Sequence, residues 1–552
     1  MVRVRKLNNT LSDFFLYSRT ASRLTFFALC SFLLLLAYKN RFIQDDAFIS
    51  FRYASNFFHG HGLLWNIAEK PVEGYTNFLW TLLMSIAFSL NVDPVIFSQI
   101  TGLICFLGTI FFTYRLSFFI MQSPFYAMLV ILVLGTNYTF SAYATGGLET
   151  QLQTFFFICI TYLTLTIAKS KNWQFLNLLL LSFVSALALL TRLDSSLPIA
   201  VLFLYLGFLI LKDSHSIKFI ISRFLTLVLP CAVIVGTWLG WKLWFYGTIL
   251  PNTFHAKIGS PTSLMNGIGY IISFFESYWL IIFPLLSVLL CKKNDFLQSQ
   301  LSVIMIVILL WCAYIVKTGG DFMEFRFLVP VLPFIFLCII YGIRLLDIHE
   351  FKIMFIILMI LIGSIWHQFM FREWRGIESI SHLYGHLKNY NEDWDGIGRT
   401  LGKLFPSGND IVIATTAAGA IPFYSKLKTI DMLGLNDEWV ARHGKFLGNR
   451  PGHQRIADLP YLVKSGVNLV IGHPQVEPIS RKTARKAWFT KELKRFLRTK
   501  FDPELIPADA TVLEISINDN YNLLVLYLLK HELIEQVIKE KQIKTYKIVL
   551  QA

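Results

Sequence analysis

Long apolar runs separated by short polar segments fill the first 370 residues of the chain. Such runs predict helices that cross a membrane, whose hydrocarbon core is about 30 Å thick. We expect eleven spans, at residues 24–38, 95–114, 124–142, 149–168, 174–191, 195–211, 219–245, 268–290, 299–316, 327–346 and 351–370. A further run at 76–91 is short and follows a polar segment that contains glycine. It predicts an interfacial or re-entrant helix within a large first outer loop, 39–94.

After residue 370 the pattern becomes that of a soluble domain. Short apolar stretches alternate with helical or loop segments, which is typical of an α/β domain. The predicted strands are 411–414, 428–432, 469–471, 512–517 and 523–529. We therefore expect two domains: a polytopic α-helical membrane domain over 1–370 and a soluble α/β domain over 371–552.

Basic residues at the ends of the apolar runs indicate how the chain is oriented. With a cytoplasmic N-terminus, four later loops should also be cytoplasmic because they carry positive charge. Those loops contain Lys169 and Lys171, Lys212 and Lys218, Lys292 and Lys293, and Arg344 and Lys352. The alternation holds only if the run at 76–91 does not cross. The α/β domain and the polar loops that precede it then lie outside the cytoplasm.

Composition supports a membrane protein and excludes several other classes. Hydrophobic residues make up 55% of the chain and charged residues 15%, against about 25% charged in an ordinary soluble domain. A single soluble globule, a disordered chain and a coiled coil are therefore excluded. The net charge of +15 lies mostly in short clusters between apolar runs, so no nucleic-acid partner is expected. The 7 cysteines lie in or beside apolar runs and imply no disulfide or zinc framework.

One basic stretch stands apart from the orienting charges. Residues 481–500 are strongly basic, with Trp488, Phe489, Phe496 and Leu497 interleaved. The stretch could lie on an anionic membrane surface or meet a phosphate-bearing lipid. It could equally be a solvated helix face.

Two adjacent carboxylates, Asp45 and Asp46, lie just beyond the first predicted span. Charged groups so close to a membrane are costly unless they are solvated or functional. One carboxylate could accept a proton from an attacking hydroxyl as a general base. The pair could instead hold a divalent cation through oxygen ligands. A purely structural account is a helix N-cap with acid in the first turn.

Other polar residues gather at the outer ends of the predicted spans. In the first outer loop Arg52, Glu73 and Tyr75 are candidates for binding hydroxyls or a phosphate. Further candidates follow later spans: Glu149, Arg192, Asp194, Asn252, His255, Lys257, Asp321 and Arg326. Arginine or lysine there could neutralise a leaving phosphate. Each also has a structural explanation, such as an Arg192–Asp194 ion pair, a Lys257 side chain extending to the membrane surface, or a turn at Asp321.

Several motifs together resemble a known family of enzymes. In chain order they read DDAFISFRYASNFFHGHGLLWN, PVEGYTNFLW, GGLET, TRLD, LPNTFHAK, GGDFMEFRFLVPVLP and IPFYSKLKTIDMLGLND. They resemble bacterial membrane glycosyltransferases of the GT-C type. The closest group looks like the mycobacterial terminal β-(1→2)-arabinofuranosyltransferase and its relatives. The resemblance covers about residues 40–475.

The resemblance implies an inverting glycosyltransferase that uses a polyprenyl-phosphate sugar on the outer face of the cytoplasmic membrane. A carboxylate of the first outer loop acts as the base, which here is Asp45 or Asp46. We assign no cofactor besides the polyprenyl-phosphate sugar donor, and a divalent cation at Asp45 and Asp46 stays an open alternative. After Arg192 the family usually has Pro-Asp-Gly where this chain has Leu193-Asp194-Ser195. The position of His255 is commonly Tyr. Both departures concern the identity of the donor and the acceptor.

Carried onto these residues, the resemblance implies a specific reaction. Arg192, Lys257 and Arg326 would hold the donor phosphate. Asn436 and Asp437 would face the cleft that binds the acceptor, or would serve packing alone. The sugar is expected to be a pentofuranose such as arabinofuranose, and the acceptor a cell-envelope glycan. The alternatives are a flippase or transporter of lipid-linked sugar, a hexosyl or mannosyl transferase acting on lipopolysaccharide or protein, and a non-catalytic glycan-binding protein. Polar residues at the ends of spans, rather than at the bilayer midplane, disfavour a transporter.

Overall fold

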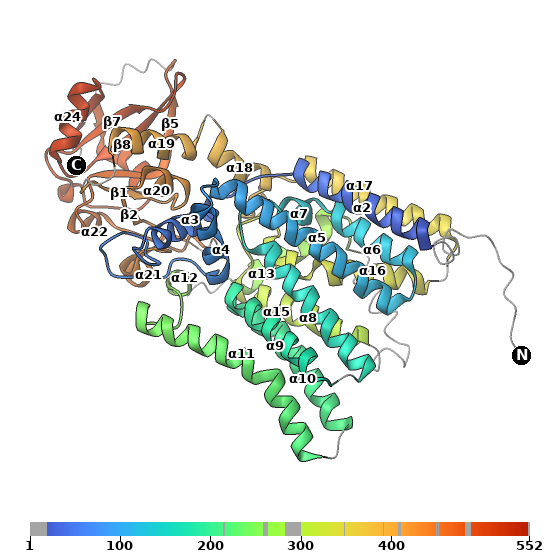
Figure 1. The fold of residues 1–552 in the computed structure, drawn as a ribbon. Helices are drawn as coiled ribbons and strands as arrows, with labels where there is room; N and C mark the ends of the chain where they lie inside the picture. Colours follow the sequence, from blue (N-terminus) through green and yellow to red (C-terminus); the bar gives the residue numbers. More distant parts are fainter. Residues whose placement is uncertain are drawn as a thin grey trace, which may run out of the picture. The chain divides into compact units, whose positions relative to one another are not determined.

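The computed structural model describes residues 19–171, 173–213, 216–257, 263–281, 300–346, 348–389, 391–406, 410–448, 450, 452–480 and 487–549. The chain divides into two compact units (Figure 1). The helical unit comprises Met1–Phe42, Val95–Gly240 and Thr262–Ile377. The α/β unit comprises Ile43–Pro94, Trp241–Pro261 and Glu378–Ala552. The first loop thus folds with the C-terminal tail. The predicted boundary between domains at 370/371 stays a prediction.

The helical unit contains most of the predicted membrane spans. Among the described residues, eight helices are long and apolar enough to cross a membrane. They are α2 (Arg19–Lys39), α5 (Pro94–Met121), α8 (Thr150–Ser170), η1 (Leu193–Ser195) with α10 (Ser196–Asp213), α11 (Ile217–Tyr246), α15 (Gln300–Thr318), η2 (Arg326–Val331) with α16 (Leu332–Leu345), and α17 (Glu350–Met370). The chain is a multi-pass membrane protein, as predicted.

Three of the predicted spans correspond to shorter or broken helices in the structure. The run at 124–142 is two helices, α6 (Pro124–Thr136) and α7 (Tyr138–Ala142), because the side chain of Asn137 accepts a hydrogen bond from the Phe140 N–H and starts a new helix. Helix α9 (Phe175–Thr191) is also shorter than a full span. The run at 268–290 begins in α13 (Ser263–Ser277), and its later part, like Lys292 and Lys293, lies outside the described residues.

Burial separates central helices from peripheral ones within the helical unit. In the most apolar segment of each helix, 78% of the residues are buried in α8 and 72% in η2 with α16. In α2 and α11 only 17% are buried, so their leucine and phenylalanine side chains are available to lipid. Helix α8 packs on α9, α10 and η2, and α6 packs on α2, α16 and α17. The central helices therefore position the polar residues at their ends.

The α/β unit is built on a mixed sheet of 7 strands in the order β2-β1-β5-β8-β7-β9-β6. Its strands are β1 (Val412–Thr415), β2 (Lys428–Asp431), β5 (Leu469–Pro478), β6 (Ala487–Phe489), β7 (Thr511–Ser516), β8 (Tyr521–Tyr527) and β9 (Lys544–Val549). Strand β1 is parallel to β2 and β5, whereas β8 is antiparallel to β5 and β7. All five predicted strands are confirmed. The sequence prediction missed β6 and β9, and also the small hairpin of β3 (Lys445–Phe446) and β4 (Arg455–Ile456).

Short helices complete this unit. From the tail come α18 (Ile380–Lys388), α19 (Trp394–Leu404), α20 (Ala420–Ser425), α21 (Glu438–His443), α22 (Leu459–Lys464), α23 (Lys494–Leu497) and α24 (Glu532–Glu540). The first loop contributes α3 (Asp45–Phe58) and α4 (Phe78–Ser89), and 241–261 contributes α12 (Asn252–Lys257). Helix α3 packs on α4, α18 and α20, and α12 packs on α21. The 12 residues of α4 span about 18 Å, less than a bilayer core.

The basic stretch 481–500 contributes three of its four interleaved apolar residues to the core, whereas Phe489 is exposed. Within its described part, 487–500, Trp488, Phe496 and Leu497 are fully buried in the hydrophobic core of the sheet. The lysines and arginines of this part face solvent. The apolar positions therefore serve packing, which favours a solvated face over a membrane-binding surface. Residues 481–486 lie outside the described residues.

Candidate functional site

Asp45 begins α3 and is held by the backbone of the tail. Its carboxylate accepts hydrogen bonds from the N–H of Gly419, at 3.0 Å, and from the N–H of Ala420, at 2.8 Å. Both amides lie where the chain leaves β1 and enters α20. The side chain is only 7% exposed. Burial raises the pKa of Asp45 to about 7, although the hydrogen bond from Ala420 opposes the shift and Asp46 adds to it.

Asp46 lies beside Asp45 in the first turn of α3 and is more accessible. The helix N-cap is Gln44, whose side chain accepts from the Asp46 N–H. Both carboxylates are thus acids of the first turn, where the helix dipole favours negative charge. Each Asp45 oxygen accepts one backbone N–H, which fixes the orientation of the carboxylate. The general base and the cation ligand both stay predictions.

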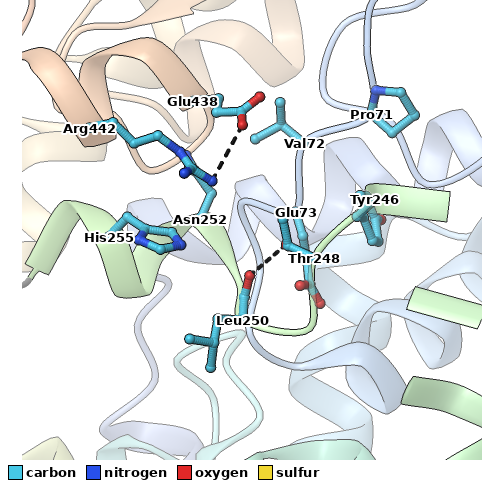
Figure 2. A pocket seen from close by; sticks show the side chains of 10 residues that line it. All are labelled: Pro71, Val72, Glu73, Tyr246, Thr248, Leu250, Asn252, His255, Glu438 and Arg442. Carbon is cyan, nitrogen blue, oxygen red and sulfur yellow. Dashed lines mark hydrogen bonds and ion pairs between the residues drawn. The ribbon is translucent and has the colours of Figure 1, made fainter. Parts of the chain in front are cut away.

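A small pocket in the α/β unit gathers several of the predicted residues (Figure 2). It is lined by Pro71, Val72, Glu73, Tyr246, Thr248, Leu250, Asn252, His255, Glu438 and Arg442. Glu73 pairs with the Lys242 ammonium at 2.8 Å, and the two side chains are only 4% and 1% exposed. Figure 2 shows Arg442 reaching Glu438, with 3.4 Å between the charged atoms. Burial raises the pKa of Glu73 to about 7, although the charge of Lys242 opposes the shift.

Two of the predicted substrate-binding residues of the first loop are engaged with the protein itself. The Arg52 guanidinium donates to the carbonyls of Trp65, Pro422 and Leu427 and to the Asn66 side chain. The Tyr75 hydroxyl lies 3.1 Å from the hydroxyl of Tyr246. Arg52 therefore ties the first loop to α20 and β2. A role for Arg52 or Tyr75 in binding substrate stays a prediction.

Three more predicted residues support local structure in the same unit. Asn252 donates from its side chain to the carbonyls of Gly434 and Leu435. Asn436 donates to Asp431 at 3.0 Å, and Asp437 accepts from the Val440 N–H and so caps α21. The Asn436 Oδ1 atom accepts a hydrogen bond from the Tyr53 hydroxyl. These contacts fix the 431–437 turn against the first loop and α12.

A second cluster lies in the helical unit, around Arg192 between α9 and η1. Arg192 donates to Glu149 at 2.7 Å and to Asp194 through Nε and Nη2. Asp194 also accepts from Gln153, at 2.7 Å, and from the Tyr314 hydroxyl, at 3.1 Å. The predicted ion pair is thus present within a larger network. One cation between two carboxylates is rigidly placed, because every partner limits its rotamers.

Arg326 lies in the same unit and pairs with Asp321 at 2.7 Å. Both side chains are largely buried. The guanidinium carbons of Arg192 and Arg326 lie 5.8 Å and 5.2 Å from the centre of the Phe327 ring. The fold therefore brings two predicted phosphate ligands to one aromatic ring. Lys257, the third, is exposed at the end of α12 in the α/β unit, and the residues that follow it are outside the described part.

Several buried ionisable residues were not predicted from the sequence, among them Lys242, Glu324 and His367. Lys242 is the partner of Glu73, and Glu324 pairs with His367 at 2.9 Å. Glu324 also accepts from Thr139. Lys242 and His367 lie inside apolar runs that predict spans, where an ionisable side chain is costly unless it is paired. That position is the signal by which both could have been found.

Comparison with solved structures shows two close likenesses in fold. ArnT from Cupriavidus metallidurans bound to undecaprenyl phosphate is 12% identical, with a TM-score of 0.55 over 92% of this chain and 98% of that chain. The apo state of the same protein is 11% identical, with a TM-score of 0.52 over the same shares. Residues 383–523 match a family described as a domain of unknown function, DUF8728. Comparison with curated protein sequences gave no match. The chain has the GT-C fold, a polytopic helical membrane protein with a C-terminal α/β domain.

Proposed function

We propose that the protein is an inverting glycosyltransferase that moves a sugar from a polyprenyl-phosphate donor to a hydroxyl of a cell-envelope glycan. The observation that carries the proposal is Asp45, a buried carboxylate oriented by two backbone amides. The fold shared with ArnT, which was solved with undecaprenyl phosphate bound, supports a lipid phosphate as the donor carrier. The leading sugar is a pentofuranose such as arabinofuranose.

In the proposed reaction Asp45 removes the proton from an acceptor hydroxyl. The hydroxyl oxygen then bonds to the anomeric carbon, and the bond from that carbon to the phosphate oxygen breaks. Polyprenyl phosphate leaves as an anion, so no protein acid is required. A base whose pKa lies near the working pH is the most effective, and the pKa of Asp45 is raised to about 7 by burial.

The transfer itself is tested with purified full-length protein in lipid nanodiscs. The protein is offered a glycan acceptor with one donor at a time: synthetic polyprenyl-phosphate arabinofuranose, or one of two hexose donors, of which one carries mannose. Products are identified by mass spectrometry. We expect a product of inverted anomeric configuration from the pentofuranose donor. Product from a hexose donor alone would replace the sugar assignment. Movement of the lipid between leaflets without any glycosidic product would favour a flippase and contradict the proposal.

Arg192 is proposed to hold the donor phosphate. Its network with Glu149 and Asp194 fixes the guanidinium in one orientation, which suits bidentate recognition of a phosphate. Arg192→Lys keeps the charge but loses the planar fork. We expect donor affinity, measured by competition with polyprenyl phosphate, to fall about tenfold or more.

Arg115→Lys is the matched control, since Arg115 is a surface residue of α5 that donates to the hydroxyl of Tyr162. Its donor affinity should equal that of the wild type. Unchanged donor affinity in Arg192→Lys would remove Arg192 from the phosphate site.

Gly419 is proposed to be essential for the position of the base. A Cβ atom at this residue would lie 2.0 Å from the Asp45 carbonyl oxygen and 2.5 Å from its Oδ1. Gly419→Ala must therefore displace the carboxylate or the loop. Because misplacing a reacting group by about 1 Å can cost about 10²-fold in rate, we expect a loss of turnover of that order in the transfer assay.

The control is Gly240→Ala in α11, where a Cβ meets no atom within 4 Å. It should keep wild-type turnover. Wild-type turnover in Gly419→Ala as well would contradict the positioning of Asp45 by this loop.

A further inference from the structure

A group of histidine and glutamate side chains around α18 contains none of the residues discussed above. His382 and His386 are four residues apart on this helix and so share one face. Their ring centres are 4.7 Å apart. Glu392 comes from the turn that joins α18 to α19. One ligand atom from each of the three residues lies within 4.8 Å of the others.

We propose that His382, His386 and Glu392 bind a zinc ion. Two imidazoles and one carboxylate form a common zinc ligand set, which leaves a fourth position for water. Carboxylate and imidazole ligands without thiolate also exclude the soft metals that prefer sulfur. Both histidines come from a single helix, so the spacing of two ligands is fixed by the helix itself.

The surroundings of His386 support this assignment. Zinc-bound histidines usually donate their second ring N–H to a carboxylate, which fixes the orientation of the ring. Here Nδ1 of His386 faces Glu392, and Nε2 lies 3.4 Å from Glu378 Oε2. The other Glu378 oxygen pairs with Arg450. The Trp394 ring stacks on His386 with 4.6 Å between ring centres and 12° between planes. The imidazole is therefore placed and buried, whereas His382 is exposed and leaves an entry path.

An ion at this position would join α18 to the start of α19 beside α3. These three helices belong to one compact unit, so the ion would act as a clip within that unit. The site uses none of the residues assigned to transfer, although His386 lies near enough to Asp45 to interact with it electrostatically. Its test therefore measures metal binding and not turnover.

The test uses full-length protein purified without a histidine tag, stripped with a chelator and then titrated with Zn²⁺ against a chromophoric indicator. We expect about one ion per chain, confirmed by elemental analysis after gel filtration. Co²⁺ in place of Zn²⁺ should give the visible absorption of a four-coordinate nitrogen and oxygen site. His382→Ala and Glu392→Gln should each lose stoichiometric binding. Glu378→Gln should weaken affinity about 10- to 100-fold, as expected for an outer partner.

Two controls make the result decisive. His443→Ala removes another exposed imidazole of the same unit and should bind as the wild type does. Asp45→Asn tests the alternative that a cation sits at the start of α3. Failure of stripped wild-type protein to bind zinc, or binding that survives His382→Ala but is lost in Asp45→Asn, would overturn the proposal. Thermal unfolding of His382→Ala is measured as well. A cooperative transition will show that the variant is folded, so that a loss of zinc binding is not a loss of structure.

Discussion

Replacing Asp45 by Asn is expected to reduce sugar transfer by about 10²- to 10⁴-fold, the usual contribution of a positioned general base. The amide keeps the size of the side chain but cannot accept a proton. Asp46→Asn should retain most of the activity, because Asp46 is more accessible and it is Asp45 that the amides of Gly419 and Ala420 orient. Turnover at saturating donor is the measurement. Near-wild-type turnover in Asp45→Asn would contradict the assignment of the base.

The pH dependence provides a second readout for the same assignment. Burial raises the pKa of Asp45 to about 7, so below that pH the base is increasingly protonated and inactive. The wild-type rate should therefore fall about tenfold for each pH unit below 7. Asp46→Asn should keep this acidic limb, shifted slightly to lower pH, because removing a neighbouring negative charge eases ionisation of Asp45. The residual activity of Asp45→Asn should lack this acidic limb of the pH–rate profile.

Removing the Lys242 ammonium is expected to destabilise the α/β unit strongly. Lys242 and Glu73 are 1% and 4% exposed and 2.8 Å apart. Breaking such a pair leaves a buried charge without compensation, at a cost of about 3–5 kcal/mol. Lys242→Met should therefore lower the midpoint of thermal unfolding in detergent. Glu73→Gln/Lys242→Met should recover much of the loss, because neither buried group is then charged. Equal midpoints for Lys242→Met and the wild type would contradict a stabilising pair.

The loss in Lys242→Met should also depend on pH. Burial already raises the pKa of Glu73 to about 7 with Lys242 present, and removing the cation raises it further. The folded variant then binds a proton that the unfolded chain releases above its ordinary pKa of about 4.3. Its stability therefore falls as pH rises through this window. The difference in thermal-unfolding midpoint between Lys242→Met and the wild type should be larger at pH 8.5 than at pH 6.

Local patterns were enough to predict most of the architecture. Spans follow from apolar runs, because a helix in lipid must satisfy its own backbone and show apolar side chains. The five predicted strands were found because each is a short buried run bounded by turns. The two-helix break at Asn137 was missed because it depends on one side-chain cap inside an apolar run. Strand β9 was missed because half of its residues are exposed and polar.

The sequence by itself determined the membrane class, the α/β tail and the polar residues of the loops, since all three depend on composition and on neighbours along the chain. Only the tertiary structure decided what those residues contact. Asp45 meets amides more than 370 positions away in the chain, and no local pattern encodes that pairing. Arg52 proved to be tied to backbone carbonyls, while Lys242 emerged as the partner of Glu73. Burial sets the pKa of a carboxylate and the cost of an unpaired charge, and burial is a property of the packed molecule.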